Sequence, residues 1–141
     1  MSPDRRTAPP PTGLNPPKTA PGPEGTTLDL VLLAEQVCTL YYAEYADEDE
    51  RYGETGRAWC RHDNQHLLSW AAESVDGFVD LHREVTWLAG VLEAREFPMD
   101  RLARNLELGA EVVRQRVPQG EDLADALVGA AVMVREHGTF L

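Results

Sequence analysis

RAWCRHDNQHLLSWAAES, residues 57–74, is the stretch of sequence on which the fold of this chain depends. It contains two tryptophans, two histidines, an aspartate and a cysteine. At about 3.6 residues per turn, one stripe of a helix would carry bulky and titratable side chains together, namely Trp59, His62, Asp63, His66, Leu67, Trp70 and Ser74. Such a stripe is expected to turn toward the rest of the domain. Because it mixes apolar bulk with titratable groups, we take it as the candidate functional site.

The chain divides into two parts by composition. It has 141 residues, and eight of its ten prolines lie in the first 25. Residues 1–25 show neither a strand period nor a helix period, so they are predicted to be a disordered, proline-rich tail with polyproline II bias. Residues 26–141 are predicted to form one helical domain, which is large enough to bury a core without disulfides or metal.

Cysteine usage and apolar runs indicate where the protein resides. Cys38 and Cys60 lie in predicted helices and lack the spacing of a metal or disulfide motif, so both are expected to be reduced and partly buried. The first residues lack the apolar segment of a secretory signal. The longest apolar run, Leu30–Ala34, is far shorter than the roughly 18 residues of a membrane span. These features predict a cytoplasmic protein that does not enter a membrane.

The charge of the chain limits its partners. The formal net charge is −11, and because the first 25 residues hold three basic and two acidic side chains, the remainder carries −12. Binding to phosphate groups requires a basic surface, which so acidic a domain lacks. Nucleic acids and anionic membranes are therefore not expected as direct partners.

Hydrophobic periodicity predicts helices and no strand. The first helix should begin at Thr26 or Thr27, because T-x-x-D places a hydroxyl cap and Asp29 in its first turn. The acidic segment at residues 47–56 is interpreted as a solvated helix end or loop, since it lacks the D-x-D-x-D-G order of a calcium site. The predicted helices are residues 26–46, 57–75, 78–96, 99–117 and 121–136. They predict an all-α protein, a five-helix bundle whose packing could be globin-like.

Two predicted helices carry patterns that bear on packing. The apolar positions of residues 78–96 form a wide stripe, so this helix is expected to be buried on more than one side. These positions are Phe78, Leu81, Val85, Trp87, Leu88, Val91 and Leu92. In the last helix, Gly129, Ala130 and Ala131 would let another helix approach closely. That neighbour could belong to the same domain or to a second copy of the chain.

The histidines of the candidate site allow a metal interpretation and a structural one. His62 and His66 have the i, i+4 spacing of a zinc motif, with His82, His137, a cysteine or a carboxylate needed as a further ligand. In the structural interpretation, Asp63 orients His66 through a hydrogen bond.

A ligand-binding interpretation also stays open. In it, the histidines line a pocket for a tetrapyrrole or another ligand, and Trp59, Trp70 and Trp87 form its walls. A catalytic pair of Cys60 and His62 is not favoured, because residues two apart lie on different faces of a helix.

The succession WCRHDNQHLLSWA, a short turn and VTWLAGVLEAREFPMDRLARNLEL resembles helical modules of bacterial regulatory proteins that often precede a cobalamin-binding domain. The resemblance covers about 50 residues and rests on Cys60, Asp63, Gln65-His66-Leu67, Trp87-Leu88, Leu92, Ala94-Arg95 and Pro98. The chain departs from such proteins in having neither a D-x-H-x-x-G loop nor an α/β pattern. The resemblance implies a helical sensory or interaction module.

The leading functional hypothesis is a non-enzymatic regulatory module that forms a homo-oligomer or binds a protein partner through its last two helices. The alternative is a ligand-sensing domain that binds haem, bilin or cobalamin between the second and third helices, with His66 or His62 as ligand. An enzyme that uses Asp63 and His66 as an acid–base pair is a third hypothesis, for which the sequence identifies no substrate. The sequence assigns no catalytic residue and no metal site.

Overall fold

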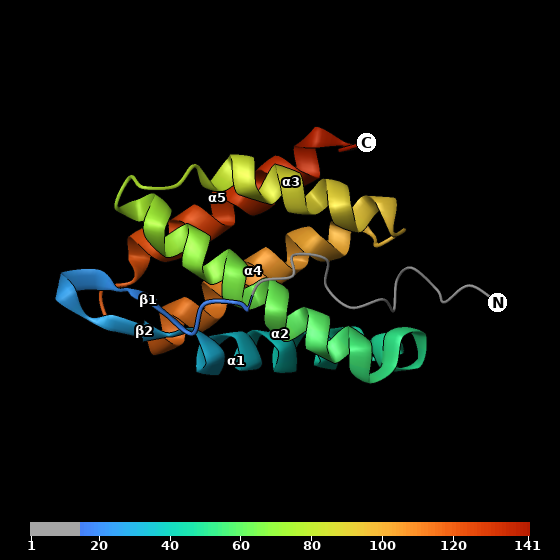
Figure 1. The fold of residues 1–141 in the computed structure, drawn as a ribbon, viewed down its shortest axis with the longest axis horizontal. Coiled ribbons are helices and arrows are strands. Elements are labelled where there is room, and N and C mark those ends of the chain that lie inside the picture. The colour runs from blue at the N-terminus through green and yellow to red at the C-terminus, as the bar shows by residue number, and fades with distance from the viewer. Residues whose placement is uncertain (1–14) are drawn as a thin grey trace.

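The computed structural model describes residues 15–141, which form five α-helices preceded by a short β-hairpin (Figure 1). The elements are β1 Thr19–Pro21, a 3-10 turn Pro23–Gly25, β2 Thr27–Asp29, α1 Leu30–Glu44, α2 Asp47–Val75, α3 Leu81–Ala94, α4 Met99–Arg116 and α5 Glu121–His137. The predicted all-α bundle of five helices is confirmed. The first 14 residues of the predicted tail lie outside the described residues. Within the described part, no helix combines the length and the apolar character needed to cross a membrane.

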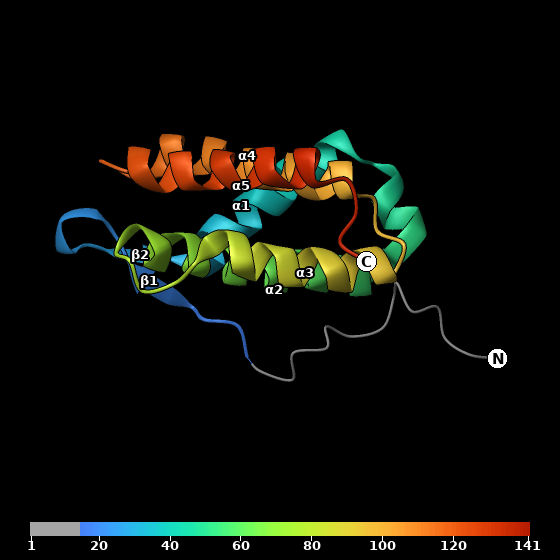
Figure 2. The same ribbon diagram turned by 90° about the horizontal axis from the view of Figure 1, so that it is seen from above.

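The helices form two layers. Figure 2 shows α2 and α3 side by side in one layer, with α1, α4 and α5 in the other. The hydrophobic core lies where these helices meet, and its most deeply buried side chains include Leu30, Val37, Leu67, Leu68, Val85, Leu106, Val113 and Leu127. No further helix of the described residues covers the other face of α2 and α3 (Figure 2), while the segment around β1 contacts α2, where the side chain of Gln65 donates to the backbone oxygen of Pro17 at 3.0 Å.

Residues 15–25 do not continue a disordered tail, which corrects the predicted domain boundary. β1 and β2 pair antiparallel with Ala20 opposite Leu28, and both side chains are buried. Asp29, and not a threonine, caps α1, because its carboxylate accepts a hydrogen bond from the backbone N–H of Leu32 at 3.1 Å. The hairpin thus replaces the first predicted turn of the helix.

The acidic segment at residues 47–56 is helical and forms the beginning of α2. Of the two predicted alternatives, the helix end is therefore correct and the loop is not, although Glu48 is buried and not solvated. The helix bends at Gly53, whose φ of 59° and ψ of −149° lie far from helical values. The first turn of α2 carries Asp47, Glu48, Asp49 and Glu50, a position where the helix dipole favours negative charge. Arg57 pairs with Asp49, and Arg101 pairs with both Asp47 and Glu48.

The helix α3 is buried on one side only, so the prediction that it is buried on more than one side is wrong. It begins at Leu81, after Asp80 accepts a hydrogen bond from the backbone N–H of Arg83 at 3.2 Å. Phe78 precedes the helix and is 82% exposed, and Trp87 is 48% exposed. Both belong to the layer of α2 and α3, whose other face is not covered by any further helix of the described residues (Figure 2).

The helices α4 and α5 lie close to the predicted bounds. The predicted inner face of α4 is buried and comprises Leu102, Leu106, Ala110 and Val113. In α5, Ala130 and Ala131 are 0% and 1% exposed, and a Cβ atom at Gly129 would lie 3.9 Å from Nε2 of His82 on α3. The sequence left open whether these small residues pack against a helix of the same domain or of a second copy. The structure shows them packed within the domain.

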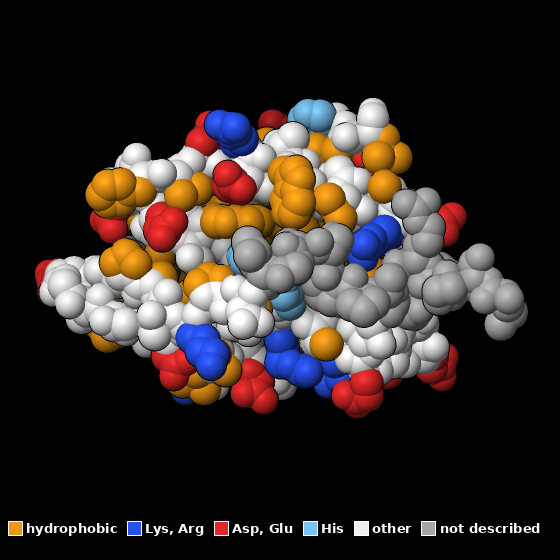
Figure 3. Space-filling view, viewed as in Figure 1, with side chains coloured by type: hydrophobic (Ala, Val, Ile, Leu, Met, Phe, Trp, Pro, Cys, Tyr) orange, Lys and Arg blue, Asp and Glu red, His pale blue; other side chains and the backbone are white. Residues whose placement is uncertain are grey.

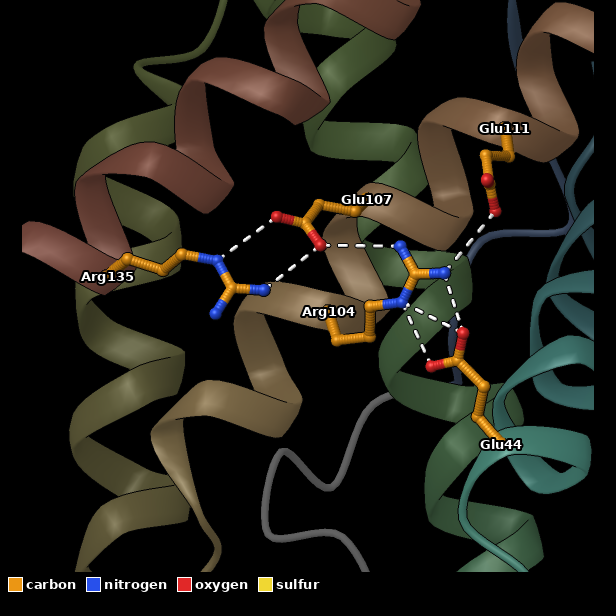
Figure 4. Close-up of polar contacts among 5 residues, drawn as sticks. All are labelled: Glu44, Arg104, Glu107, Glu111 and Arg135. Atoms are coloured by element: carbon orange, nitrogen blue, oxygen red, sulfur yellow. Dashed lines mark hydrogen bonds and ion pairs between the residues drawn. The ribbon is translucent and has the colours of Figure 1, made fainter.

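Arg104 on α4 connects three helices at the surface of the bundle (Figure 4). Its guanidinium donates to Glu44 on α1 at 2.6 Å and to Glu107 at 3.4 Å, and Glu107 also accepts a hydrogen bond from Arg135 on α5 at 3.0 Å. These hydrogen bonds lower the pKa of Glu44 and of Glu107. Because the side chains are between 29% and 44% exposed, each pair contributes at most about 1 kcal/mol to stability.

Candidate functional site

The six side chains of the predicted site separate into three environments. Trp59 and Asp63 line an internal cavity. His62, His66 and Trp70 form a partly buried row along α2, which we call the α2 row, and Trp87 lies exposed on α3. Positions three apart on a helix differ in direction by about 60°, so a broad stripe spans more than one face. The structure therefore offers two adjacent sites in place of one.

The three rings of the α2 row follow one another along the helix. The ring centroids of His62 and His66 are 4.8 Å apart, and those of His66 and Trp70 are 5.5 Å apart. This succession follows from the i, i+4 spacing of the three residues. The hydrogen bond predicted between Asp63 and His66 is made with His62 instead, whose Nδ1 lies 3.0 Å from Oδ1 of Asp63.

His66 has the least satisfied imidazole of the row. Burial lowers its pKa and the neighbouring His62 lowers it further, although Asp63 opposes this shift. The ring is therefore neutral at pH 7. Its Nε2 atom is buried and has no hydrogen-bond partner among the described residues. Buried polar atoms are seldom left in this state, so Nε2 marks a position where a ligand could be accommodated.

An internal cavity of about 60 Å³, the α1–α4 cavity, lies between the first four helices. Its apolar and aromatic walls include Tyr41, Tyr42, Trp59, Leu88, Leu92, Phe97 and Leu102. The charged and amide side chains that line it are Glu48, Asp63, Asn64, Arg95 and Asn105. Its walls come from helices that are distant in the chain, so no local sequence pattern indicates the cavity.

Glu48 is a buried carboxylate held by partners on two other helices. Its side chain is 3% exposed and accepts hydrogen bonds from the Tyr41 hydroxyl at 2.9 Å and from Arg101 at 2.6 Å. Burial and the adjacent carboxylate raise the pKa of Tyr41, so the phenol stays protonated and donates. Arg101 also lies over the ring of Tyr45, with Cζ 4.4 Å from the centroid. These contacts fix the bent start of α2 against α1 and α4.

The two cysteines are free and lie beside the same amide group. Nδ2 of Asn64 is 3.5 Å from Sγ of Cys60 and 3.8 Å from Sγ of Cys38. A hydrogen bond with Cys38 and burial both raise the pKa of the Cys60 thiol. Cys60 is therefore protonated at neutral pH and is not an activated nucleophile.

Hydrophobic side chains are exposed on the layer formed by α2 and α3. Figure 3 shows them gathered over α3 and the adjoining part of α2, with histidine side chains beside them. We call the exposed apolar residues of these two helices and their connection, Val75, Phe78 and Trp87, the α2–α3 surface. Grouped apolar side chains on a surface indicate contact with a ligand or a partner more strongly than single ones do.

A bare metal ion finds few ligands in the described part of the chain, where no three His, Cys, Asp or Glu side chains are grouped to hold one. The third ligand that a zinc site at His62 and His66 requires is therefore missing from residues 15–141.

Comparison of the chain with protein-family models, curated proteins and solved structures finds no match. The function of the chain is therefore inferred from the geometry of the α2 row and of the α1–α4 cavity.

Proposed function

We propose that this domain is a ligand-sensing module that binds a metal-containing tetrapyrrole, haem or cobalamin, at the α2 row formed by His62, His66 and Trp70. The observation that carries the proposal is the state of His66. Burial lowers its pKa, and its buried Nε2 atom has no hydrogen-bond partner within residues 15–141. A neutral imidazole with an uncommitted ring nitrogen is the form that binds a metal.

A tetrapyrrole suits this donor set better than a bare ion does. A structural zinc site takes about four protein ligands, and the described residues hold no such group. A tetrapyrrole supplies its own ring nitrogens, so the protein needs to provide only an axial ligand. One histidine is sufficient for that role. A bilin lacks a metal and would not use Nε2 of His66 in this way, which favours haem or cobalamin.

The surroundings of His66 suit a flat, largely apolar ligand. The rings of His62 and Trp70 lie on either side of it in the row, and Trp87 is exposed on the neighbouring helix α3. Aromatic surfaces of this kind stabilise planar ligands. Because His66 is only partly buried, rotation about its side-chain torsions can bring Nε2 toward a ligand.

Absorption spectroscopy tests this function directly. The full chain is titrated with haem and, separately, with cobalamin, and binding is expected to shift the main absorption band of one of them. Loss of the axial ligand in His66→Ala should alter the band and weaken binding by about tenfold or more. His82→Ala, at an exposed position on α3, is the matched control and should bind as the wild type does. Unchanged spectra with both compounds, or identical titrations for His66→Ala and wild type, would contradict the proposal.

The exposure of the α2–α3 surface favours a second candidate function, protein interaction. Phe78 and Trp87 are 82% and 48% exposed, and both are large hydrophobic side chains of the kind that anchor interfaces. Self-association through the last two helices, which the sequence predicts, would have to use other residues than Ala130, which is completely buried. Val132 on α5 is 47% exposed and is suited to that test.

Light scattering of two variants separates these surfaces. If copies associate through the α2–α3 surface, Trp87→Glu should yield monomers while Val132→Glu does not. If they associate through α4 and α5, the result should be reversed. A wild-type chain that stays monomeric at high concentration would argue against self-association by either route and would leave a different protein as the partner.

A further inference from the structure

The lining of the α1–α4 cavity includes two side chains whose nitrogen donors have no hydrogen-bond acceptor within the described residues, Trp59 and Arg95. It is distinct from the α2 row, and the inference drawn from it does not depend on tetrapyrrole binding. The cavity is closed on several sides by aromatic and aliphatic side chains, so a polar group within it has limited access to water. Such a group needs a partner in the protein or in a bound molecule.

The acceptors that line the cavity already have partners. Glu48 accepts hydrogen bonds from Tyr41 and Arg101. Asp63 lies 3.0 Å from Nδ1 of His62, its nearest basic partner. The two asparagine side chains in the cavity wall bond to each other, so neither their donors nor their acceptors require a ligand.

Two donors remain. The indole Nε1 of Trp59 is buried without a hydrogen-bond partner in the described part of the chain, and the residue is only 8% exposed. The guanidinium of Arg95 lies over the same indole, with Cζ 4.7 Å from the ring centroid. No ion pair within residues 15–141 includes Arg95. By contrast, carboxylates pair with Arg57, Arg101, Arg104 and Arg135. Both side chains line the cavity.

We infer that the α1–α4 cavity is a binding site for a short-chain monocarboxylate. One carboxylate can accept a charge-assisted hydrogen bond from the Arg95 guanidinium and a second bond from the Trp59 indole N–H. It would also neutralise the Arg95 cation, which has no carboxylate partner within residues 15–141. A water molecule could accept the indole bond, but it carries no charge to balance Arg95.

The size and walls of the cavity restrict the ligand further. A cavity of about 150 Å³ holds benzene, and about 10–15 Å³ holds one water, so a space of about 60 Å³ admits a molecule of a few heavy atoms. Leu88, Leu92 and Leu102 line the cavity and provide an apolar surface for a short alkyl chain. Acetate and propionate have the required combination of charge, length and apolar character, whereas butyrate has as many heavy atoms as benzene and marks the upper limit of size.

Titration of the full chain with propionate tests the site, with the Trp59 indole N–H proton as the reporter in NMR. Trp59→Phe identifies this resonance among the three tryptophans by its disappearance. Propionate should shift the Trp59 signal more than those of Trp70 and Trp87, and the affinity should be at least about tenfold higher than for propionamide, which has the same shape without the charge.

Variants of the two donors complete the test by calorimetry. Arg95→Gln should weaken propionate binding by about tenfold or more, and Trp59→Phe by about fivefold, the effect of one hydrogen bond. Arg83→Gln, an exposed residue on the same helix, is the matched control and should bind as the wild type does. His66→Ala should also keep propionate binding, which separates this site from the tetrapyrrole proposal.

Three outcomes would overturn the inference. They are equal affinities for propionate and propionamide, undiminished binding in Arg95→Gln, and the lack of any response to acetate, propionate or butyrate. The last result would mean that the cavity holds water only. Since the wild-type comparison of propionate with propionamide needs no substitution, a donor variant that fails to fold leaves the test intact.

Discussion

The side-chain amides of Asn64 on α2 and Asn105 on α4 exchange two hydrogen bonds, of 3.0 Å and 2.8 Å, inside the bundle. The residues are 3% and 7% exposed, so water cannot readily replace a lost partner. The pair links the two helical layers by a buried polar contact, as the bonds of Glu48 to Tyr41 and Arg101 do. Its members depend on each other, and this dependence can be measured.

Replacement of Asn105 by leucine is expected to lower the free energy of unfolding by about 2 kcal/mol, because Oδ1 of Asn64 loses its donor while it stays buried. Nδ2 of Asn64 keeps its hydrogen bond to the backbone oxygen of Cys60 at 2.9 Å. The double variant Asn64→Leu/Asn105→Leu removes both amides and should lose less stability than the two single variants added together. Urea unfolding of the four proteins gives the coupling energy. Strict additivity would mean that the two side chains do not interact in solution.

The buried ion pair of Glu48 and Arg101 should contribute more to stability than the exposed pairs do. In Arg101→Ala the Glu48 carboxylate loses its cation while it stays buried, so we expect a loss of about 3 kcal/mol. Arg51→Ala removes an arginine that is 47% exposed and lies 3.8 Å from Asp47, and it should change stability by less than about 0.5 kcal/mol. Thermal and urea unfolding would show the contrast, and equal losses for both variants would contradict it.

Local sequence patterns were sufficient for most of the helices. The buried face of α4 follows from the spacing of Leu102, Leu106, Ala110 and Val113 alone. The hairpin was missed because each strand has three residues, too few to display alternation, and lies in a proline-rich segment. The start of α2 was missed because Gly53 was interpreted as part of a loop, whereas it forms a bend within the helix.

The candidate site could be predicted only in part, since its chemistry depends on tertiary contacts. The spacing of His62, His66 and Trp70 is sufficient to predict a row of rings on one helix. The partners of Glu48 lie on α1 and α4 and that of Asn64 lies on α4, and no local signal marks them. Glu48 in particular is one of four consecutive acidic residues, and burial alone distinguishes it from its neighbours.

The pH dependence of stability should report the state of His66. Its pKa is lowered in the folded protein by burial and by His62, so below the ordinary value of about 6.5 the unfolded chain binds this proton more readily than the folded chain does. The free energy of unfolding is therefore expected to fall as the pH decreases through and below 6.5, before the carboxylates with lowered pKa, such as Glu107, begin to titrate.

Urea unfolding of wild type and His66→Gln between pH 7 and pH 5 measures this contribution. The glutamine variant cannot take up the proton and should lose less stability than the wild type over this range. His82→Gln, at an exposed position, should keep the wild-type slope. A His66→Gln slope equal to that of the wild type would indicate that His66 titrates alike in the folded and unfolded chains.

The bend in α2 should depend on glycine at position 53. With φ at 59° and ψ at −149°, Gly53 occupies a region that residues with a Cβ atom rarely adopt, so Gly53→Ala is expected to cost about 1–3 kcal/mol. No described atom lies within 4 Å of the added Cβ, so this cost arises from the backbone and not from a clash. Gly109→Ala is the matched control, because Gly109 lies inside α4 and its added Cβ would meet Leu127 at an ordinary 3.6 Å. That substitution should leave stability unchanged or raise it by up to about 1 kcal/mol, since alanine favours the helix. If thermal unfolding found Gly53→Ala as stable as Gly109→Ala, the bend that places Glu48 beside Tyr41 and Arg101 would not be a feature of the folded protein.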